Sequence, residues 1–147
     1  MAESIAHGDA RPLAVAGQPI YSALLPIPII CFVGALIADL MYLRSPDQMW
    51  IDFAAWLLLA GLIAAGVAGV ILIVETVRAR RRTGALIAHF ALLFAAFVLE
   101  ILNSFIHARD GWTAVVPAGL VLSILAVVAS LLAGWFWRSF ADNRGGV

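Results

Sequence analysis

The sequence contains no lysine and only one cysteine, and charged residues make up 12% of its 147 residues. A soluble domain of this size carries about twice that share of charge. Hydrophobic residues reach 64%, and the mean hydropathy is +1.03. A chain this short buries a limited fraction of its surface, so it could not hide this apolar content in a water-soluble core. These features exclude a soluble enzyme and a disordered tail, and they indicate a small integral membrane protein.

The charge balance and the motifs exclude further classes. Nine arginines meet nine acidic residues, so the net charge is zero, and a nucleic-acid partner is not expected because phosphate binding needs a basic surface. The single thiol, Cys31, is too little for a disulfide or a metal cluster and is expected to pack as a small hydrophobe. No P-loop, nucleophile elbow or HExxH motif is present. We therefore expect no catalytic residue, no metal site and no enzyme activity.

Four apolar runs dominate the chain, at residues 24–43, 53–74, 84–106 and 113–137. Each is long enough for a membrane-spanning helix, which needs about 20 apolar residues, and none alternates as the strands of a membrane barrel do. Short connections force neighbouring helices to be antiparallel. The expected fold is an all-α integral membrane protein, with a four-helix antiparallel bundle at residues 24–137, a short N-terminal segment at 1–23 and a tail at 138–147.

The arginines predict the orientation, because they favour the cytoplasmic side of a membrane. The connection between the second and third runs contains four of them, Arg78, Arg80, Arg81 and Arg82. With that connection inside the cell, seven arginines lie inside and two outside, and both termini are predicted to be cytoplasmic. The N-terminal apolar stretch is too short for a cleavable signal peptide, so we expect the first span to direct insertion.

Small residues spaced four apart mark the faces through which membrane helices pack. Two such stripes stand out: Gly61, Ala65 and Gly69 in the second run, and Ala126, Ser130 and Gly134 in the fourth. They either hold the four helices together or, for the stripe of the second run, contact another chain. The expected partners are therefore membrane lipids and other membrane protein subunits.

The third run contains most of the polar residues inside the predicted membrane region. At about 100° per residue, His89, Glu100, Asn103 and His107 fall within about 60° of one another on a helix. Ionisable groups within a span are costly to bury and indicate a functional site by default. The third run is thus expected to turn a polar edge toward the bundle interior or a partner.

Two contacts are expected from this polar edge. Asp39, in the outer half of the first run, lies at the depth of Glu100, Asn103 and His107, so these four can form a hydrogen-bonded cluster. His89 lies at the depth of Glu75, and a hydrogen bond between them is the second expected contact. Arg78 competes for Glu75, because residues three apart share a helix face.

Three roles are open for these residues: hydrogen bonds that hold helices together, a proton or ion path, and contact with haem or quinone through His89. His89 and His107 lie 18 residues apart, about 27 Å along one helix, so they cannot ligate one haem within a subunit. The sequence therefore requires no cofactor. Haem or quinone remains an option only at an interface with a partner, with His89 as the candidate contact.

The segment of residues 18–28, QPIYSALLPIP, followed by Gly34 and Asp39, resembles the first span of the DUF2231 family of predicted bacterial membrane proteins. His89 and Asn103 resemble the family's histidine and its polar partner, and residues 109–111 and 117–147 resemble its last helix and tail. The similarity covers about residues 17–147. It implies a four-helix protein of the bacterial inner (cytoplasmic) membrane.

The resemblance also shows where this chain diverges. Family members carry a His-Pro-x-His-Pro motif before the first span, whereas here Gln18 and Tyr21 take the histidine positions and Ser22 takes that of the second proline. If the family's histidines bind a metal or haem, most of that site is missing here. Members fused to Rieske-type domains connect the family with membrane redox chemistry.

Three alternative functions are considered, and they are given in order of preference. The first is a non-catalytic membrane subunit that anchors or assists a larger respiratory or photosynthetic redox complex. The second is an electron-transfer membrane protein that contacts haem or quinone through His89. The third is a small proton-coupled transporter that uses Asp39, Glu100 and His107.

Overall fold

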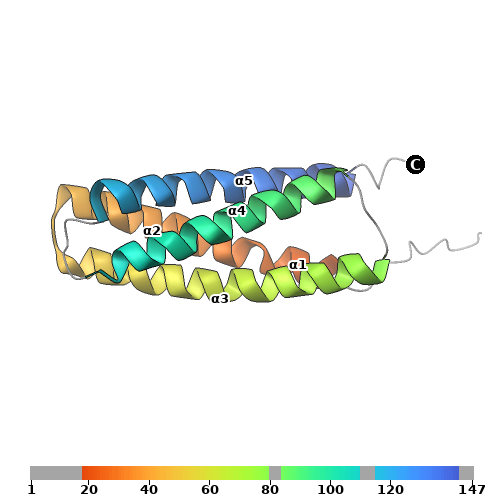
Figure 1. Ribbon diagram of the computed structural model, residues 1–147, viewed down its shortest axis with the longest axis horizontal. Helices are drawn as coiled ribbons and strands as arrows, with labels where there is room; N and C mark the ends of the chain where they lie inside the picture. The colour runs from red at the N-terminus through yellow and green to blue at the C-terminus, as the bar shows by residue number, and fades with distance from the viewer. Residues whose placement is uncertain (1–17, 80–83, 110–114, 143–147) are drawn as a thin grey trace, which may run out of the picture.

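The computed structural model describes residues 18–79, 84–109 and 115–142. All regular structure within these ranges is helical, in the order α1 (Gln18–Leu24), α2 (Pro26–Arg44), α3 (Gln48–Ala79), α4 (Gly84–His107), a short helical turn η1 (Val115–Gly119) and α5 (Leu120–Asp142) (Figure 1). Four segments are long and apolar enough to cross a membrane: Ile20–Arg44, Gln48–Arg78, Gly84–His107 and Val115–Arg138. The predicted all-α fold with four membrane-spanning helices is confirmed.

The four long segments lie side by side as an elongated bundle, and consecutive segments run in opposite directions (Figure 1). α1 begins and α5 ends at the same end, which we call the terminal end; α2 and α4 finish at the opposite end. α4 packs most extensively against α5, and α2 packs against α3, whereas α3 and α4 contact each other less. The bundle is therefore tightest within the α2–α3 pair and the α4–α5 pair, and it is looser between α3 and α4.

The helices extend beyond the apolar runs at several ends. The first helical segment starts at Gln18 rather than at residue 24, and α3 covers Gln48–Ala79 rather than residues 53–74. Charged side chains such as Asp52 and Glu75 mark where the apolar layer ends, but they do not stop the backbone from making its helical hydrogen bonds. The proline at the start of α2, Pro26, has no amide hydrogen, and this costs little in a first helical turn.

The start of the last span also differs from the prediction. The fourth apolar run starts at residue 113, but α5 itself begins at Leu120, and Pro117 lies in the preceding turn η1. Val116 has an extended backbone, with φ −116° and ψ 125°. This difference follows from sterics, since a proline disfavours helical geometry in the residue before it.

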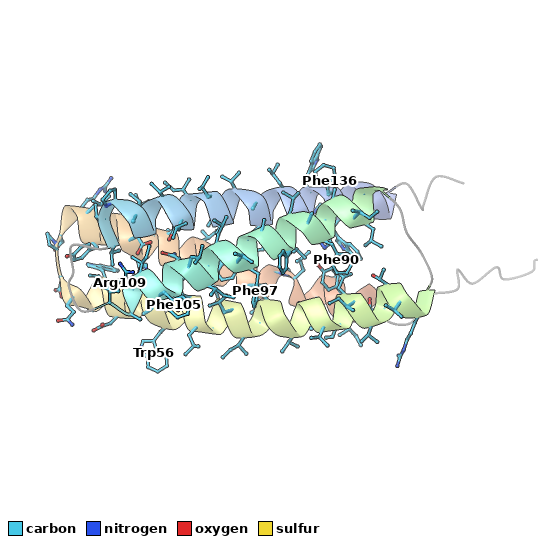
Figure 2. The ribbon with its side chains drawn as sticks, viewed as in Figure 1. Trp56, Phe90, Phe97, Phe105, Arg109 and Phe136 are labelled. Atoms are coloured by element: carbon cyan, nitrogen blue, oxygen red, sulfur yellow. The ribbon has the colours of Figure 1, made fainter. Side chains whose placement is uncertain are left out.

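Two apolar clusters form the interior. One is built around Phe32 and Leu58 where α2, α3 and α5 meet, and the other contains Tyr21 and Leu72 near the terminal end. Many large apolar side chains point outward instead; Trp56, for example, is 71% exposed and extends away from the bundle (Figure 2). An apolar exterior around helices whose backbone hydrogen bonds are internally satisfied is what a lipid environment requires.

The two predicted stripes of small residues behave differently. On α5, Ala126 and Ser130 are buried inside the subunit. On α3, a β-carbon added to Gly61 would lie 2.5 Å from the Phe32 ring, so Gly61 allows α2 to approach closely, while a β-carbon on Gly69 would meet nothing within 4 Å. A β-carbon added to Gly134, the third residue of the α5 stripe, would lie 3.9 Å from Ile29 Cδ1. The α5 stripe and one end of the α3 stripe therefore pack within the chain.

Candidate functional site

Polar side chains from α2, α4 and α5 meet inside the bundle, toward the end opposite the termini. Asp39 on α2 accepts two hydrogen bonds, one at Oδ2 from the Ser123 hydroxyl at 2.6 Å and one at Oδ1 shared with His107 Nε2 at 2.9 Å. Asp39 is 1% exposed, and the side chains of the Asp39–His107 ion pair are almost completely buried. A buried carboxylate thus joins three helices.

The same cluster continues along α4. The Asn103 amide donates to Ser123 Oγ at 2.8 Å and to Glu100 Oε2 at 3.1 Å. Glu100, Asn103 and Ser123 are completely buried. We call these five residues the Asp39 cluster; its members are Asp39, Glu100, Asn103, His107 and Ser123. The four residues that the sequence placed at one depth are thereby brought together.

Helical spacing explains the α4 side of the cluster. Residues 100, 103 and 107 are three and four apart, so they share one face of α4. Ser123 escaped prediction because a serine in an apolar run carries no charge to mark it. A signal existed in the seven-residue spacing of Ser123, Ser130 and Trp137, which places all three on one side of α5.

In the Asp39 cluster, every buried side-chain polar atom except two has a hydrogen-bond partner among the described residues. His107 Nδ1 donates to the Asn103 carbonyl at 3.0 Å, because a carbonyl oxygen can only accept. The Asp39–His107 pair then holds one shared proton at the Nε2–Oδ1 contact, and the pair is neutral wherever that proton lies. Within the described part of the chain, Glu100 Oε1 and Asn103 Oδ1 are buried without a hydrogen-bond partner.

A second polar group lies nearer the terminal end. His89 Nδ1 donates to the Ala133 carbonyl at 2.7 Å, so Nε2 is left to accept from the Tyr21 hydroxyl at 2.5 Å. The Trp137 ring packs against both side chains, with ring centroids 4.8 Å from Tyr21 and 5.2 Å from His89. We call Tyr21, His89 and Trp137 the His89 cluster. It ties α1, α4 and α5 together.

The predicted hydrogen bond between His89 and Glu75 is wrong. Both His89 nitrogens are engaged elsewhere, and Glu75 on α3 is half-buried outside the His89 cluster. Tyr21 takes the place expected for Glu75, because α1 continues the first span by two turns and carries the phenol into the interior. Arg78, the predicted competitor, is exposed at the end of α3.

Neither buried histidine fits a haem. An axial ligand needs an imidazole nitrogen with a free lone pair, yet His89 Nε2 accepts from Tyr21 and His107 Nε2 contacts Asp39. Both Nδ1 atoms donate to backbone carbonyls. Among the described residues, no three His, Cys, Asp or Glu side chains converge as metal ligands either.

The two clusters are separated by the middle of the membrane region. Glu100 and His89 are 11 residues apart, which is about 16 Å along α4. Ser130, 2% exposed, lies between Ser123 and Ala133 on α5 and so falls between the two clusters. The buried polar residues of the described segments therefore lie along the contact between α4 and α5, and the only break is the stretch between the two clusters.

The Tyr21–His89 hydrogen bond is expected to contribute to stability. Changing Tyr21 to phenylalanine leaves His89 Nε2 without a donor, and we expect the free energy of unfolding to fall by about 1 kcal/mol, within the range for hydrogen bonds between membrane helices. Titration of the detergent-solubilised protein with sodium dodecyl sulfate measures this loss. Phe105→Leu, at an exposed site, is the control, and equal stability of the two variants would show that the hydrogen bond contributes nothing.

The comparisons with known proteins agree with this architecture. Residues 17–145 match a family described as "Predicted membrane protein (DUF2231)". Neither the curated proteins nor the solved structures provide a match. Since the matched residues cover nearly the whole chain, including all four membrane-spanning segments and both polar clusters, the protein belongs to the DUF2231 family of predicted membrane proteins.

Proposed function

We propose that this protein is a small proton transporter in which Glu100 of the Asp39 cluster binds and releases the transported proton. The observation that carries the proposal is the buried, unpartnered Oε1 atom of Glu100 in a multi-pass membrane protein. Carboxyl groups inside a membrane are costly, and those that face a bundle interior are typical of proton pathways. No catalytic role is proposed for any residue.

Counting the protons and charges of the Asp39 cluster identifies Glu100 as the residue whose protonation changes the net charge of the cluster. The Asp39–His107 pair is neutral as a unit, and Ser123 and Asn103 are uncharged. Glu100 receives one hydrogen bond, from Asn103, and no cation lies against its second oxygen among the described residues. A proton on Oε1 makes the whole cluster neutral, and its departure leaves one buried negative charge. Binding and release at Glu100 therefore change the charge of the membrane interior by one unit.

Proton flux into reconstituted vesicles tests the proposal. Vesicles that contain the protein and a pH-sensitive dye receive a pH jump, with potassium and valinomycin to carry compensating charge. We expect wild-type protein to speed equilibration and Glu100→Gln to slow it by about tenfold or more, a change of 1.4 kcal/mol in the barrier. Glu75→Gln is the matched control, because Glu75 is also a membrane-region glutamate but lies outside both clusters. Equal flux through wild type and Glu100→Gln would refute the proposal.

A second candidate is an accessory subunit of a larger respiratory or photosynthetic redox complex in the bacterial inner membrane, with both termini in the cytoplasm. The supporting observation is the exposed apolar surface of α3, which includes Trp56 and Val77, both 71% exposed. Such a surface faces either lipid or other membrane helices. Mass spectrometry of proteins that co-purify from the native membrane tests this role, and recovery of the chain alone would argue against it.

A further inference from the structure

An apolar cavity of about 230 Å³ lies between α2, α3 and α4, in the half of the bundle nearer the terminal end. Its α3 wall includes the small residues Ala65, Gly66 and Gly69, and its α4 wall includes three phenylalanines. Phe90 and Phe97 extend from α4 into this region (Figure 2). Ser130 is the sole polar side chain of the lining. The cavity thus lies beside the α3–α4 pair, which is packed less extensively than α2–α3 or α4–α5.

The cavity is continuous with the outer surface of the bundle. Val70 and Ile73 on α3 and Phe94 on α4 line it, and they are also 62%, 53% and 69% exposed. β-Carbons added to Gly66 or Gly69 would meet nothing within 4 Å. In a membrane-spanning bundle, an opening at this depth leads to the hydrocarbon layer and not to water.

The size and lining of the cavity restrict its occupant. Water needs two to four polar partners, and the lining offers one hydroxyl. A helix from a second copy has a diameter of about 10 Å with its side chains and does not fit a hollow of this volume. A flexible hydrocarbon chain matches both the apolar walls and the lateral opening, and it restores the dispersion contacts that an unfilled space would lose.

We propose that this cavity is a specific lipid-binding site that holds one acyl chain of a phospholipid. The chain lies between the α3 wall, which contains Gly66 and Gly69, and the α4 wall, which contains Phe90 and Phe97, and it enters through the opening lined by Val70, Ile73 and Phe94. The site is separate from the Asp39 cluster, so it does not depend on proton transport. A phospholipid held in this way stays with the protein through detergent extraction, unlike lipids that merely surround the bundle.

Filling the cavity from α3 tests the proposal. Gly69→Phe places a ring where the acyl chain is proposed to lie, whereas Val67→Phe adds the same ring at an exposed position that does not line the cavity. Native mass spectrometry of the extracted proteins measures the phospholipid that each variant retains. We expect wild type and Val67→Phe to retain one phospholipid and Gly69→Phe to bind it about tenfold more weakly, since displacing two methylene groups already has that effect.

A second variant and three further results also decide whether the cavity binds a phospholipid. Gly66→Leu is a second filling variant, with circular dichroism and gel filtration to verify its fold, and it should lose the phospholipid as Gly69→Phe does. Equal phospholipid retention by wild type and both filling variants would overturn the proposal. So would a wild-type protein that carries no phospholipid, carries a different small molecule in the cavity, or forms a dimer that the filling variants disrupt.

Discussion

Replacing Asp39 with leucine is expected to lower the free energy of unfolding by about 3–5 kcal/mol, the range for removing one partner of a buried ion pair. The carboxylate accepts from Ser123 on α5 and contacts His107 on α4, so its loss leaves a hydroxyl and an imidazole without acceptors inside the bundle. Reversible unfolding in mixed micelles of mild detergent and sodium dodecyl sulfate measures the change. Leu40→Ala, one residue along on the exposed side of α2, is the control.

The double variant Asp39→Leu with His107→Leu separates the ion pair from the packing around it. Removing both charged partners avoids an uncompensated buried charge, so the double variant should be more stable than the sum of the two single losses predicts. The coupling free energy from this double-mutant cycle is expected to be about 1–3 kcal/mol. A coupling of zero would mean that Asp39 and His107 do not interact in the folded protein.

Gly61→Leu is expected to lower the free energy of unfolding by about 3 kcal/mol, at the upper end of the cost of overpacking a core. A β-carbon at this position would lie 2.5 Å from Phe32 Cε1 and 3.0 Å from Cys31 Cβ, so α2 and α3 must move apart before a larger side chain fits. The matched variant is Gly69→Leu, on the same helix, where a β-carbon meets open space. The same denaturant titration should find it within about 1 kcal/mol of wild type.

The contrast between the two glycines tests the packing arrangement itself. If α3 packed against α2 through the whole predicted stripe, both substitutions would be similarly damaging. If Gly69→Leu proved the more destabilising, α3 would be rotated about its axis so that Gly61 no longer faces Phe32. A smaller Gly61→Ala loss, in proportion to the volume added, would support a close contact at the Phe32 ring.

Within the Asp39 cluster, the structure distinguishes residues expected to stabilise the fold from the residue proposed to carry a proton, a distinction that the sequence does not make. Asp39 and His107 compensate each other and are expected to stabilise the fold, whereas Glu100 has one oxygen that no described residue compensates. A stability measurement should therefore respond most to Asp39, and the proposed proton flux should respond most to Glu100. Variants at both positions, compared in both assays, distinguish a structural polar core from a transport site.

Much of the architecture follows from local sequence features. Four long apolar runs with short connections predict four antiparallel spans, because each run must satisfy its backbone hydrogen bonds within itself in lipid. The spacing of Glu100, Asn103 and His107 predicts one polar face on α4, since a helix repeats about every 3.6 residues. Because neighbouring spans are antiparallel, counting residues from the ends of each span places these three residues at the same membrane depth as Asp39. The helix ends were less predictable, because charge marks the edge of the apolar layer and not the end of a helix.

The sequence by itself therefore determined the number of spans, their alternation and which face of α4 is polar, since these depend on composition and helical periodicity alone. Only the tertiary structure decided the partners: Ser123 for Asp39, Tyr21 instead of Glu75 for His89, and open space instead of a helix beside Gly69. Partners depend on how each helix is rotated and tilted against its neighbours. That rotation is set by many small packing contacts made at once, which no single run of residues encodes.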